Sequence, residues 1–174
     1  VTPLTIDSRI WPRTAAIAER FWSSKEVNDL DNMKKRLKVI NFQLEELGIT
    51  HIKNRDLILR NIANHKSIDA LKTLSNICEP LKVYSRNKGG TEYKTFSPFT
   101  LFADACVPDA EDAVVFKKTV TLFLKSKDKN NLHNILTYLK KWSDNDAEFE
   151  KINQNPITNS LASLSKNVSQ ISKL

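Results

Sequence analysis

Apolar residues recur at helical spacing along the first third of the chain. Residues 13–22 are rich in alanine and present little polar surface, which predicts a helix that packs on more than one side. Pro12 fits the first turn of this helix because its missing N–H has no partner there. A polar connection follows and ends at a capping residue, Asp29 or Asp31. These features predict one helix that begins near residue 8 and a second that begins near residue 30.

The second helix has the clearest pattern in the chain. Its apolar residues recur at steps of three and four, and its other face carries lysines and other polar residues. Gly48 stands where a left-handed residue closes a helix. The apolar positions are Leu30, Met33, Leu37, Ile40, Leu44 and Leu47.

Shorter apolar faces follow up to residue 80. One lies within residues 57–63, and another, within residues 68–77, is capped by Ser67 and stopped by Pro80. Residues 82–104 have no helical pattern and form the longest irregular stretch. We expect this stretch to wrap over helices that its aromatic side chains contact. These side chains are Tyr84, Tyr93, Phe96, Phe99 and Phe102.

The remaining third is again helical in pattern. A helix is predicted from about Pro108 to Lys125, and another around residues 132–142. Ser143 is expected to cap a new helix with an acidic first turn, and Pro156 to start a last one that runs to Ile171. The expected fold is all-α, a bundle of six to eight helices with short connections.

Composition narrows the class of protein. The net charge is +7, but basic residues are spread along the chain beside acidic ones, which favours solvated helix surfaces over a nucleic-acid site. No apolar run is long enough to predict a membrane span, and no signal segment is visible. Cys78 and Cys106 are too few for a disulfide scaffold, and they are either free thiols or one disulfide.

The sequence offers no self-contained active site. The densest acidic group lies before or at a helix start, where capping and the helix dipole account for it: Asp104, Asp109, Glu111 and Asp112. His51, His65 and His133 are isolated from one another and from both cysteines, so no metal site is predicted. No serine elbow or complete phosphate loop is present. We therefore predict no catalytic residue, metal or cofactor for this chain, and no substrate-binding residue can be named.

One segment is unusual enough to suggest a family. Residues 8–23, SRIWPRTAAIAERFWS, resemble the last helix of the catalytic barrel in β-N-acetylhexosaminidases of glycoside hydrolase family 20. The continuation to Ile49 is similar to the next helix of that family. Glu79 to Cys106 looks like the helical C-terminal extension of some bacterial members, and no resemblance extends past residue 117. The resemblance implies a barrel remnant at residues 1–23 and a helical C-terminal domain at residues 24–174.

The family's chemistry is not carried by these residues. In family 20 the substrate's own acetamido oxygen attacks the anomeric carbon, assisted by an Asp-Glu pair, and a Trp-x-Glu motif binds the sugar. This sequence contains neither motif, and the resemblance places Val1 just downstream of them. The resemblance thus implies a chain inactive by itself, from a periplasmic or secreted enzyme that removes terminal N-acetylhexosamine from glycans. It assigns four residues to packing or ion pairs in the barrel wall, namely Trp11, Arg13, Glu19 and Trp22.

The expected partner is the upstream catalytic barrel of the same polypeptide. A barrel helix without its barrel exposes a large apolar face, so association with the following helices or with a second copy is also expected. Two other functions remain open. One is a helical module that binds protein or carbohydrate through the aromatic stretch Tyr84 to Phe102, and the other is a basic bundle that binds nucleic acid.

Overall fold

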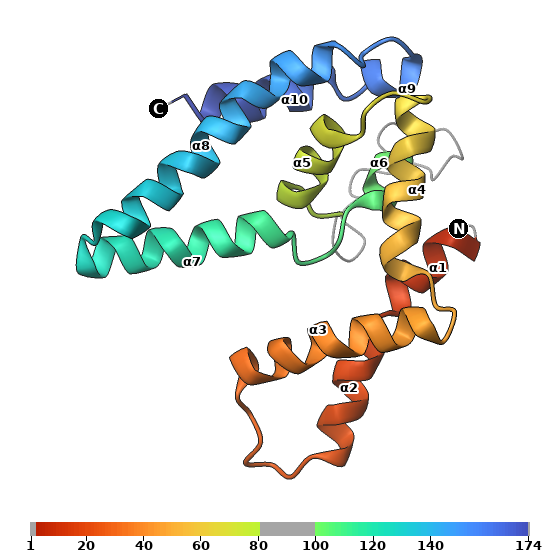
Figure 1. Cartoon of the computed structure of the whole chain (residues 1–174), viewed down its shortest axis with the longest axis vertical. Helices are drawn as coiled ribbons and strands as arrows, with labels where there is room; N and C mark the ends of the chain where they lie inside the picture. Colours follow the sequence, from red (N-terminus) through yellow and green to blue (C-terminus); the bar gives the residue numbers. More distant parts are fainter. Residues whose placement is uncertain (1–2, 81–99, 174) are drawn as a thin grey trace, which may run out of the picture. The chain divides into compact units, whose positions relative to one another are not determined.

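The structure is a computed structural model that describes residues 3–80 and 100–173, and within them every regular element is a helix (Figure 1). The all-α prediction is confirmed for these residues, which form ten helices instead of the six to eight expected. The N-terminal segment forms two helices instead of one, and two helices have only six and four residues. The elements are α1 (Pro3–Ile10), α2 (Arg13–Trp22), α3 (Leu30–Glu46), α4 (His51–Ala63), α5 (Asp69–Ile77), α6 (Thr100–Ala105), α7 (Glu111–Ser126), α8 (Lys129–Glu150), α9 (Pro156–Asn159) and α10 (Ala162–Ile171).

The chain divides into two compact units, residues 1–57 and residues 58–174. We call them unit 1 and unit 2. A different boundary, between residues 23 and 24, is expected from the sequence, because residues 1–23 resemble part of a catalytic barrel. The division into compact units does not test that origin, so this boundary stays a prediction. No helix in the described part of the chain is both long and apolar enough to cross a membrane.

Unit 1 is built on α3, whose two ends form as expected. The carboxylate of Asp29 accepts a hydrogen bond from the Asn32 amide at 3.0 Å, which caps the first turn. Gly48 has φ +88°, so the chain leaves the helix through a left-handed residue. Between these ends Leu44 is buried and Met33, Leu37 and Ile40 are half-buried, but Leu30 and Leu47 are exposed. The apolar face predicted for α3 is therefore covered only along its middle.

Replacing Gly48 by alanine is expected to lower the stability of unit 1 by about 1–2 kcal/mol, because an L-residue at positive φ brings its Cβ close to the backbone. Apart from Gly48 itself and its two chain neighbours, a Cβ at this position would meet no atom within 4 Å, so the expected loss is local backbone strain and not a clash with other side chains. Chemical unfolding of the two variants Gly48→Ala and Gly48→Asn measures it. Asparagine tolerates this conformation and should cost less than alanine. An equal loss in both variants would contradict the assignment of the loss to backbone strain.

Unit 2 has the larger hydrophobic core. Helix α5 packs against α6, α7 and α8, and α10 packs along α8. The buried apolar residues come from helices far apart in sequence. Residues 58–74 thus pack against residues 149–161 in one core. They are Ile58, Leu59, Ile62, Ala63, Ala70, Leu71, Leu74, Phe102, Ala105, Cys106, Phe149, Ile152 and Leu161. Cys106 lies in this core and Cys78 packs against it, both as free thiols.

The expected irregular stretch at residues 82–104 can be judged only at its end, because residues 81–99 lie outside the described residues. There the prediction is wrong: residues 100–105 form the short helix α6. Phe102 is 3% exposed and lies in the core of unit 2, which confirms the packing expected for this aromatic residue. Tyr84, Tyr93, Phe96 and Phe99 are not described.

Helices α7 and α8 form a long hairpin (Figure 1). Lys127 ends α7 in the left-handed conformation at φ +54°, and the Asp128 carboxylate caps α8 by accepting from the Asn131 amide at 3.0 Å. An aromatic cluster joins the two helices: the ring centroids of Phe116 and Trp142 are 4.8 Å apart, and those of Tyr138 and Trp142 are 5.4 Å apart.

The prediction that Ser143 caps a new helix is wrong, because α8 continues without a break to Glu150. No proline or glycine interrupts this segment, so the backbone ladder has no reason to stop. The Ser143 hydroxyl donates to the Lys140 carbonyl one turn back instead of accepting from an amide ahead. Asp144, expected in a first turn, instead pairs with Lys140 at 3.0 Å.

The last predicted helix is divided into α9 and α10. Asn155 caps α9 through a capping box with Thr158, and Pro156 occupies the first helical position as expected. In α10 the predicted apolar residues Leu164 and Val168 pack only partly against the core. Leu161, the predicted apolar residue just before α10, is fully buried, but within α10 the most buried positions are Ser165 and Ser169, and Ser172 at the end of the helix is buried as well.

Candidate functional site

Several acidic residues in the described part of the chain stand at helix starts or join neighbouring helices. Glu111 and Asp112 stand in the first turn of α7, as predicted from the helix dipole. Asp112 also pairs with Lys141 of α8 at 3.2 Å. Among the described residues, no three His, Cys, Asp or Glu side chains converge in a way that could hold a metal ion. Glu111 and Asp112 therefore stabilise the start of α7 and its contact with α8.

A shallow cleft of about 340 Å³ lies between α5 and α8 in unit 2. Three of its charged residues are engaged locally: Asp144 with Lys140, and Glu148 with Lys151. The hydrogen bond from Lys140 lowers the pKa of Asp144 below its ordinary value. Acid–base hydrolysis needs one protonated and one ionised carboxyl group in unlike surroundings, and exposed ion pairs do not create that difference. Asp144 and Glu148 of the cleft therefore do not form such a pair.

His51 is the histidine with a distinctive environment. Its side chain is 6% exposed in unit 1, and its Nε2 lies 2.9 Å from the Asn41 Oδ1. With Nε2 donating to that oxygen, the other ring nitrogen, Nδ1, is buried and unpaired. Burial lowers the pKa of His51 below its ordinary value of 6.5. The negative charges of Glu45 and Asp7 act in the other direction and raise this pKa, but the effect of burial is larger. His51 is accordingly a neutral structural residue at pH 7.

Unit 1 should lose stability as the pH falls below 6.5. The unfolded state then binds a proton at His51 that the folded state resists, so the contribution of neutral His51 is present above the unfolded pKa and is lost toward the lower folded pKa. Urea unfolding at pH 7.5 and pH 5.5 tests this, with His51→Gln as the control that cannot titrate. The stability difference between the two pH values should be smaller in the variant. An equal pH dependence in both proteins would exclude His51 as its source.

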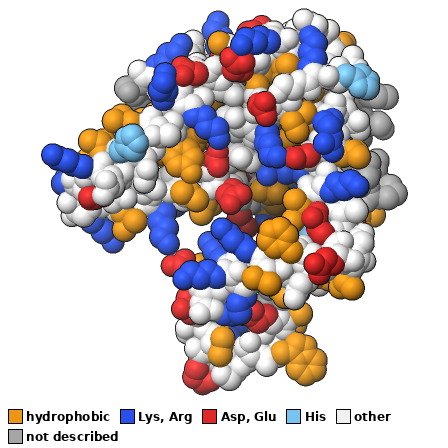
Figure 2. All heavy atoms as spheres, in the orientation of Figure 1, with side chains coloured by type: hydrophobic (Ala, Val, Ile, Leu, Met, Phe, Trp, Pro, Cys, Tyr) orange, Lys and Arg blue, Asp and Glu red, His pale blue; other side chains and the backbone are white. Residues whose placement is uncertain are grey.

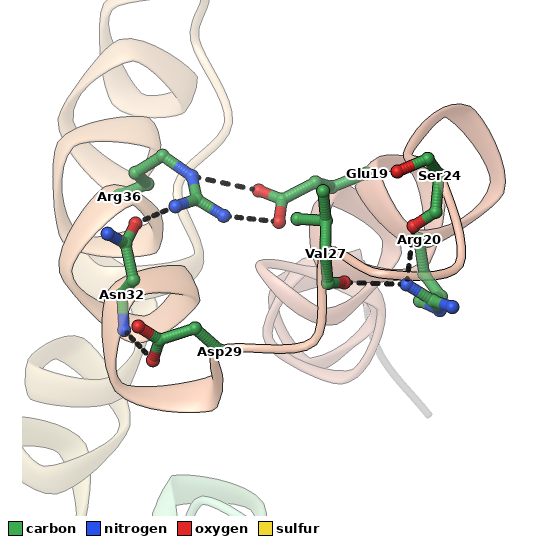
Figure 3. A network of polar contacts seen from close by, with 7 residues as sticks. All are labelled: Glu19, Arg20, Ser24, Val27, Asp29, Asn32 and Arg36. Carbon is green, nitrogen blue, oxygen red and sulfur yellow. Dashed lines mark hydrogen bonds and ion pairs between the residues drawn. The ribbon is translucent and has the colours of Figure 1, made fainter.

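The interaction that organises the N-terminal helices joins α2 to α3 (Figure 3). Two nitrogens of Arg36 contact both carboxylate oxygens of Glu19, with Nη2 to Oε1 at 2.5 Å and Nε to Oε2 at 3.3 Å. Arg36 also contacts the side-chain oxygen of Asn32, one turn earlier on α3. The Glu19 hydrogen bond raises the pKa of Arg36. A two-point contact of this kind fixes direction as well as distance.

The connection between α2 and α3 is held by Arg20. Its guanidinium donates to the Val27 carbonyl at 2.6 Å and to the Ser24 carbonyl at 3.3 Å (Figure 3). Adjacent residues of α2 thus have separate tasks: Glu19 binds the next helix and Arg20 binds the connecting loop. Together they set both the position of α2 and the rotation of its faces.

That rotation leaves apolar residues of α2 uncovered. Ile17 and Phe21 lie two residues before and after Glu19, so each projects roughly opposite to the side chain that contacts α3. They are 54% and 83% exposed, and Trp22 is 90% exposed. On α3, Val39 and Phe42 are also exposed. We call these five residues the uncovered apolar set of unit 1, and large exposed sets of this kind mark contact surfaces.

The four residues assigned to packing or ion pairs have different surroundings in the structure. Glu19 makes the ion pair described above, and Trp11 is half-buried. Arg13 is exposed, and Trp22 is almost fully exposed, so the Trp22 ring does not pack inside this chain. Sequence reasoning missed Arg36 as the partner of Glu19. The two lie 17 positions apart, on different helices, and no local spacing rule connects them.

The comparisons with known proteins bear on this arrangement. No protein-family model matches the chain. The β-hexosaminidase subunit beta of Mus musculus is 43% identical over 49 residues, which are 28% of this chain and 9% of that protein. The same subunit of Homo sapiens is 41% identical over 49 residues, with the same coverage.

A solved structure is similar along nearly the whole chain. The chitobiase of Flavobacterium johnsoniae, a protein of glycoside hydrolase family 20, matches 99% of this chain at 49% identity with a TM-score of 0.91. The match covers 27% of the chitobiase, so the chain spans only part of the length of each relative. The chain is therefore homologous to a portion of the β-hexosaminidases and chitobiases of glycoside hydrolase family 20.

Proposed function

We propose that this chain is the non-catalytic C-terminal helical region of a β-N-acetylhexosaminidase. The parent enzyme would remove terminal N-acetylhexosamine from glycans by substrate-assisted, retaining hydrolysis. The observation that carries the proposal is the likeness to a family 20 chitobiase over 99% of this chain but only 27% of that protein. A region of that size is too short to contain a catalytic barrel, which takes about 250 residues.

The chemistry of the residues supports a non-catalytic role. The sequence has no Asp-Glu dipeptide, and its three tryptophans are followed by Pro-Arg, Ser-Ser and Ser-Asp instead of by a residue and glutamate. The carboxylates of Glu19, Asp112, Asp144 and Glu148 are paired with Arg or Lys. For Asp144 the hydrogen bond from Lys140 lowers the pKa, whereas a general acid has to hold its proton near neutral pH.

The uncovered apolar set of unit 1 supports the proposed partner. The Glu19–Arg36 contact holds α2 so that Ile17 and Phe21 face away from α3. Exposed aromatic and aliphatic side chains cost free energy in water, and burial in a neighbouring surface recovers it. We assign that neighbour to the upstream catalytic barrel of the same polypeptide, with α2 forming part of the barrel wall.

Hydrolysis of a chromogenic N-acetyl-β-glucosaminide tests the assignment. The purified 174-residue chain should release no chromophore, and a longer polypeptide that carries this chain after a barrel with an Asp-Glu pair should release it. In that polypeptide, changing the glutamate of the pair to glutamine should abolish release while leaving the helical region folded. Hydrolysis by the isolated chain would overturn the proposal, as would an inactive longer polypeptide that folds and binds substrate.

We also propose that the parent enzyme acts in the periplasm or outside the cell, which only the family resemblance supports. Fractionation of the producing cells, with hexosaminidase activity assayed in each fraction, tests this. Activity confined to the cytoplasmic fraction would contradict it.

A further inference from the structure

The distal part of the α7–α8 hairpin concentrates positive charge. We call residues 117–136 the hairpin tip. It contains five lysines and one acidic residue, so it carries four of the seven net positive charges of the chain. All five lysine side chains are exposed. They are Lys117, Lys118, Lys125, Lys127 and Lys129.

The single acid in the hairpin tip is committed to the backbone. Asp128 is half-buried, and its carboxylate accepts from the Asn131 amide as the cap of α8. Lys127 stands beside it, with its Nζ 5.3 Å from the centre of the Phe123 ring. The lysines therefore surround an acid that is already hydrogen-bonded, and the tip presents a positive field to its surroundings.

Leucines are exposed among these lysines. Leu122 and Leu124 of α7 are 46% and 61% exposed, and Leu132 and Leu136 of α8 are 39% and 54% exposed. Figure 2 shows blue and orange side chains next to each other at the left, where α7 meets α8 in Figure 1. Leu132 and Leu136 are four residues apart, so they lie on one face of α8.

The packing of unit 2 explains why this surface is uncovered. The aromatic cluster that closes the hairpin involves Phe116, Tyr138 and Trp142, which lie outside the tip. Helix α10 is joined to α8 farther on, where Ser169 donates to the Ser143 carbonyl and Ser165 donates to Asp146. Helix α7 has no fully buried residue. The tip therefore extends beyond the core that stabilises the rest of the unit.

We propose that the hairpin tip is an attachment site for a lipid bilayer surface that contains anionic lipids. The lysines bind headgroup phosphates, and the leucines on the side that meets the bilayer enter the boundary between headgroups and acyl chains. Leu122 and Leu124 project to roughly opposite sides of α7, so only one of these two enters. A nucleic acid would attract the lysines but would leave four leucines exposed to water. Lysine and leucine side by side match the layered polarity of a bilayer surface. This inference depends on unit 2 alone and does not rest on the proposed function.

Flotation of the full 174-residue chain with vesicles tests the site. Vesicles of equal parts phosphatidylglycerol and phosphatidylcholine should bind it at low salt, and vesicles of phosphatidylcholine alone should not. The triple variant Lys117→Gln, Lys125→Gln and Lys129→Gln should bind about 100-fold more weakly, because each lysine near an anionic surface contributes roughly fivefold. The matched control removes the same charge from α3 with Lys34→Gln, Lys35→Gln and Lys38→Gln, and it should change binding only slightly.

A second variant separates a bilayer from other polyanions. Leu124→Ser with Leu136→Ser keeps every charge and should weaken vesicle binding by about tenfold or more, since apolar insertion is lost. Helix content measured by circular dichroism confirms that both hairpin variants fold. Unchanged binding of the leucine variant would overturn the proposal, and so would an equal loss in the α3 control. Binding to duplex DNA or to an acidic protein with none to anionic vesicles would also overturn it.

Discussion

Replacing Phe149 by alanine is expected to destabilise unit 2 by about 3–5 kcal/mol, the range typical of removing a buried phenylalanine side chain. Phe149 is fully buried and belongs to the cluster that joins α4 and α5 to α8. Its removal costs the transfer energy of the ring and leaves a cavity between helices far apart in sequence. For a domain of this size the melting temperature should fall by roughly 10–20 °C. Thermal and urea unfolding, followed by circular dichroism, measure both quantities.

The matched control is the same substitution at an exposed site. Phe42 on α3 is 67% exposed, and Phe42→Ala should change the free energy of unfolding by no more than about 0.5 kcal/mol. A small effect at Phe149 would mean that α8 is not anchored through this ring. A large effect at Phe42 would show instead that unit 1 buries that side chain against another part of the chain or a second copy.

The helix ends that could be predicted are those with local chemical signals. Asp29 and Gly48 bracket α3 because a capping carboxylate and a left-handed glycine act within one turn of their own position. Pro156 starts α9 for a similar local reason. The family resemblance was equally local, since it depended on rare residues at fixed spacing in one short segment. Features that depend on a few neighbouring residues can be predicted without knowledge of the tertiary structure.

The packing of α10 shows where such reasoning fails. The predicted apolar row of this segment is fully buried only at Leu161, just before α10, while within α10 the most buried positions are Ser165 and Ser169. The hydroxyls are satisfied by long-range partners: Ser165 donates to Asp146 at 2.7 Å and Ser169 to the Ser143 carbonyl at 2.6 Å. Small side chains let α10 approach α8 closely, and the hydrogen bonds offset the cost of burying polar groups. Only the fold reveals those partners.

The candidate site follows the same division. Exposure of an apolar face was expected from a barrel helix without its barrel, and the family resemblance assigned Glu19 to packing or to an ion pair in the barrel wall. That Glu19 forms an ion pair instead of only packing, and that its partner is Arg36, depended on how two helices pack. The contacts of Arg20 likewise could not be predicted, because they depend on the path of the loop between the helices, whose carbonyls Arg20 binds.

Trp22→Ala is expected to change the free energy of unfolding little in the isolated chain and strongly in a longer polypeptide. In the isolated chain Trp22 is 90% exposed, so the variant should change the free energy of unfolding by no more than about 0.5 kcal/mol. In the longer polypeptide of the proposed function, α2 packs into the barrel wall, and losing a buried indole should cost about 3–5 kcal/mol. Urea unfolding of both forms, with and without the substitution, measures the difference.

Trp142→Ala provides the comparison, because Trp142 is 6% exposed and packs against Phe116 and Tyr138 within unit 2. Its loss should destabilise both forms by a similar amount, since its neighbours are present in each. Only Trp22 should distinguish the two contexts. If Trp22→Ala remains neutral in the longer polypeptide, the exposed face of α2 is not covered by the barrel, and its large apolar side chains must be explained by another partner. If Trp22→Ala is costly in the longer polypeptide and neutral in the isolated chain, the surface that covers α2 belongs to the barrel of the longer polypeptide.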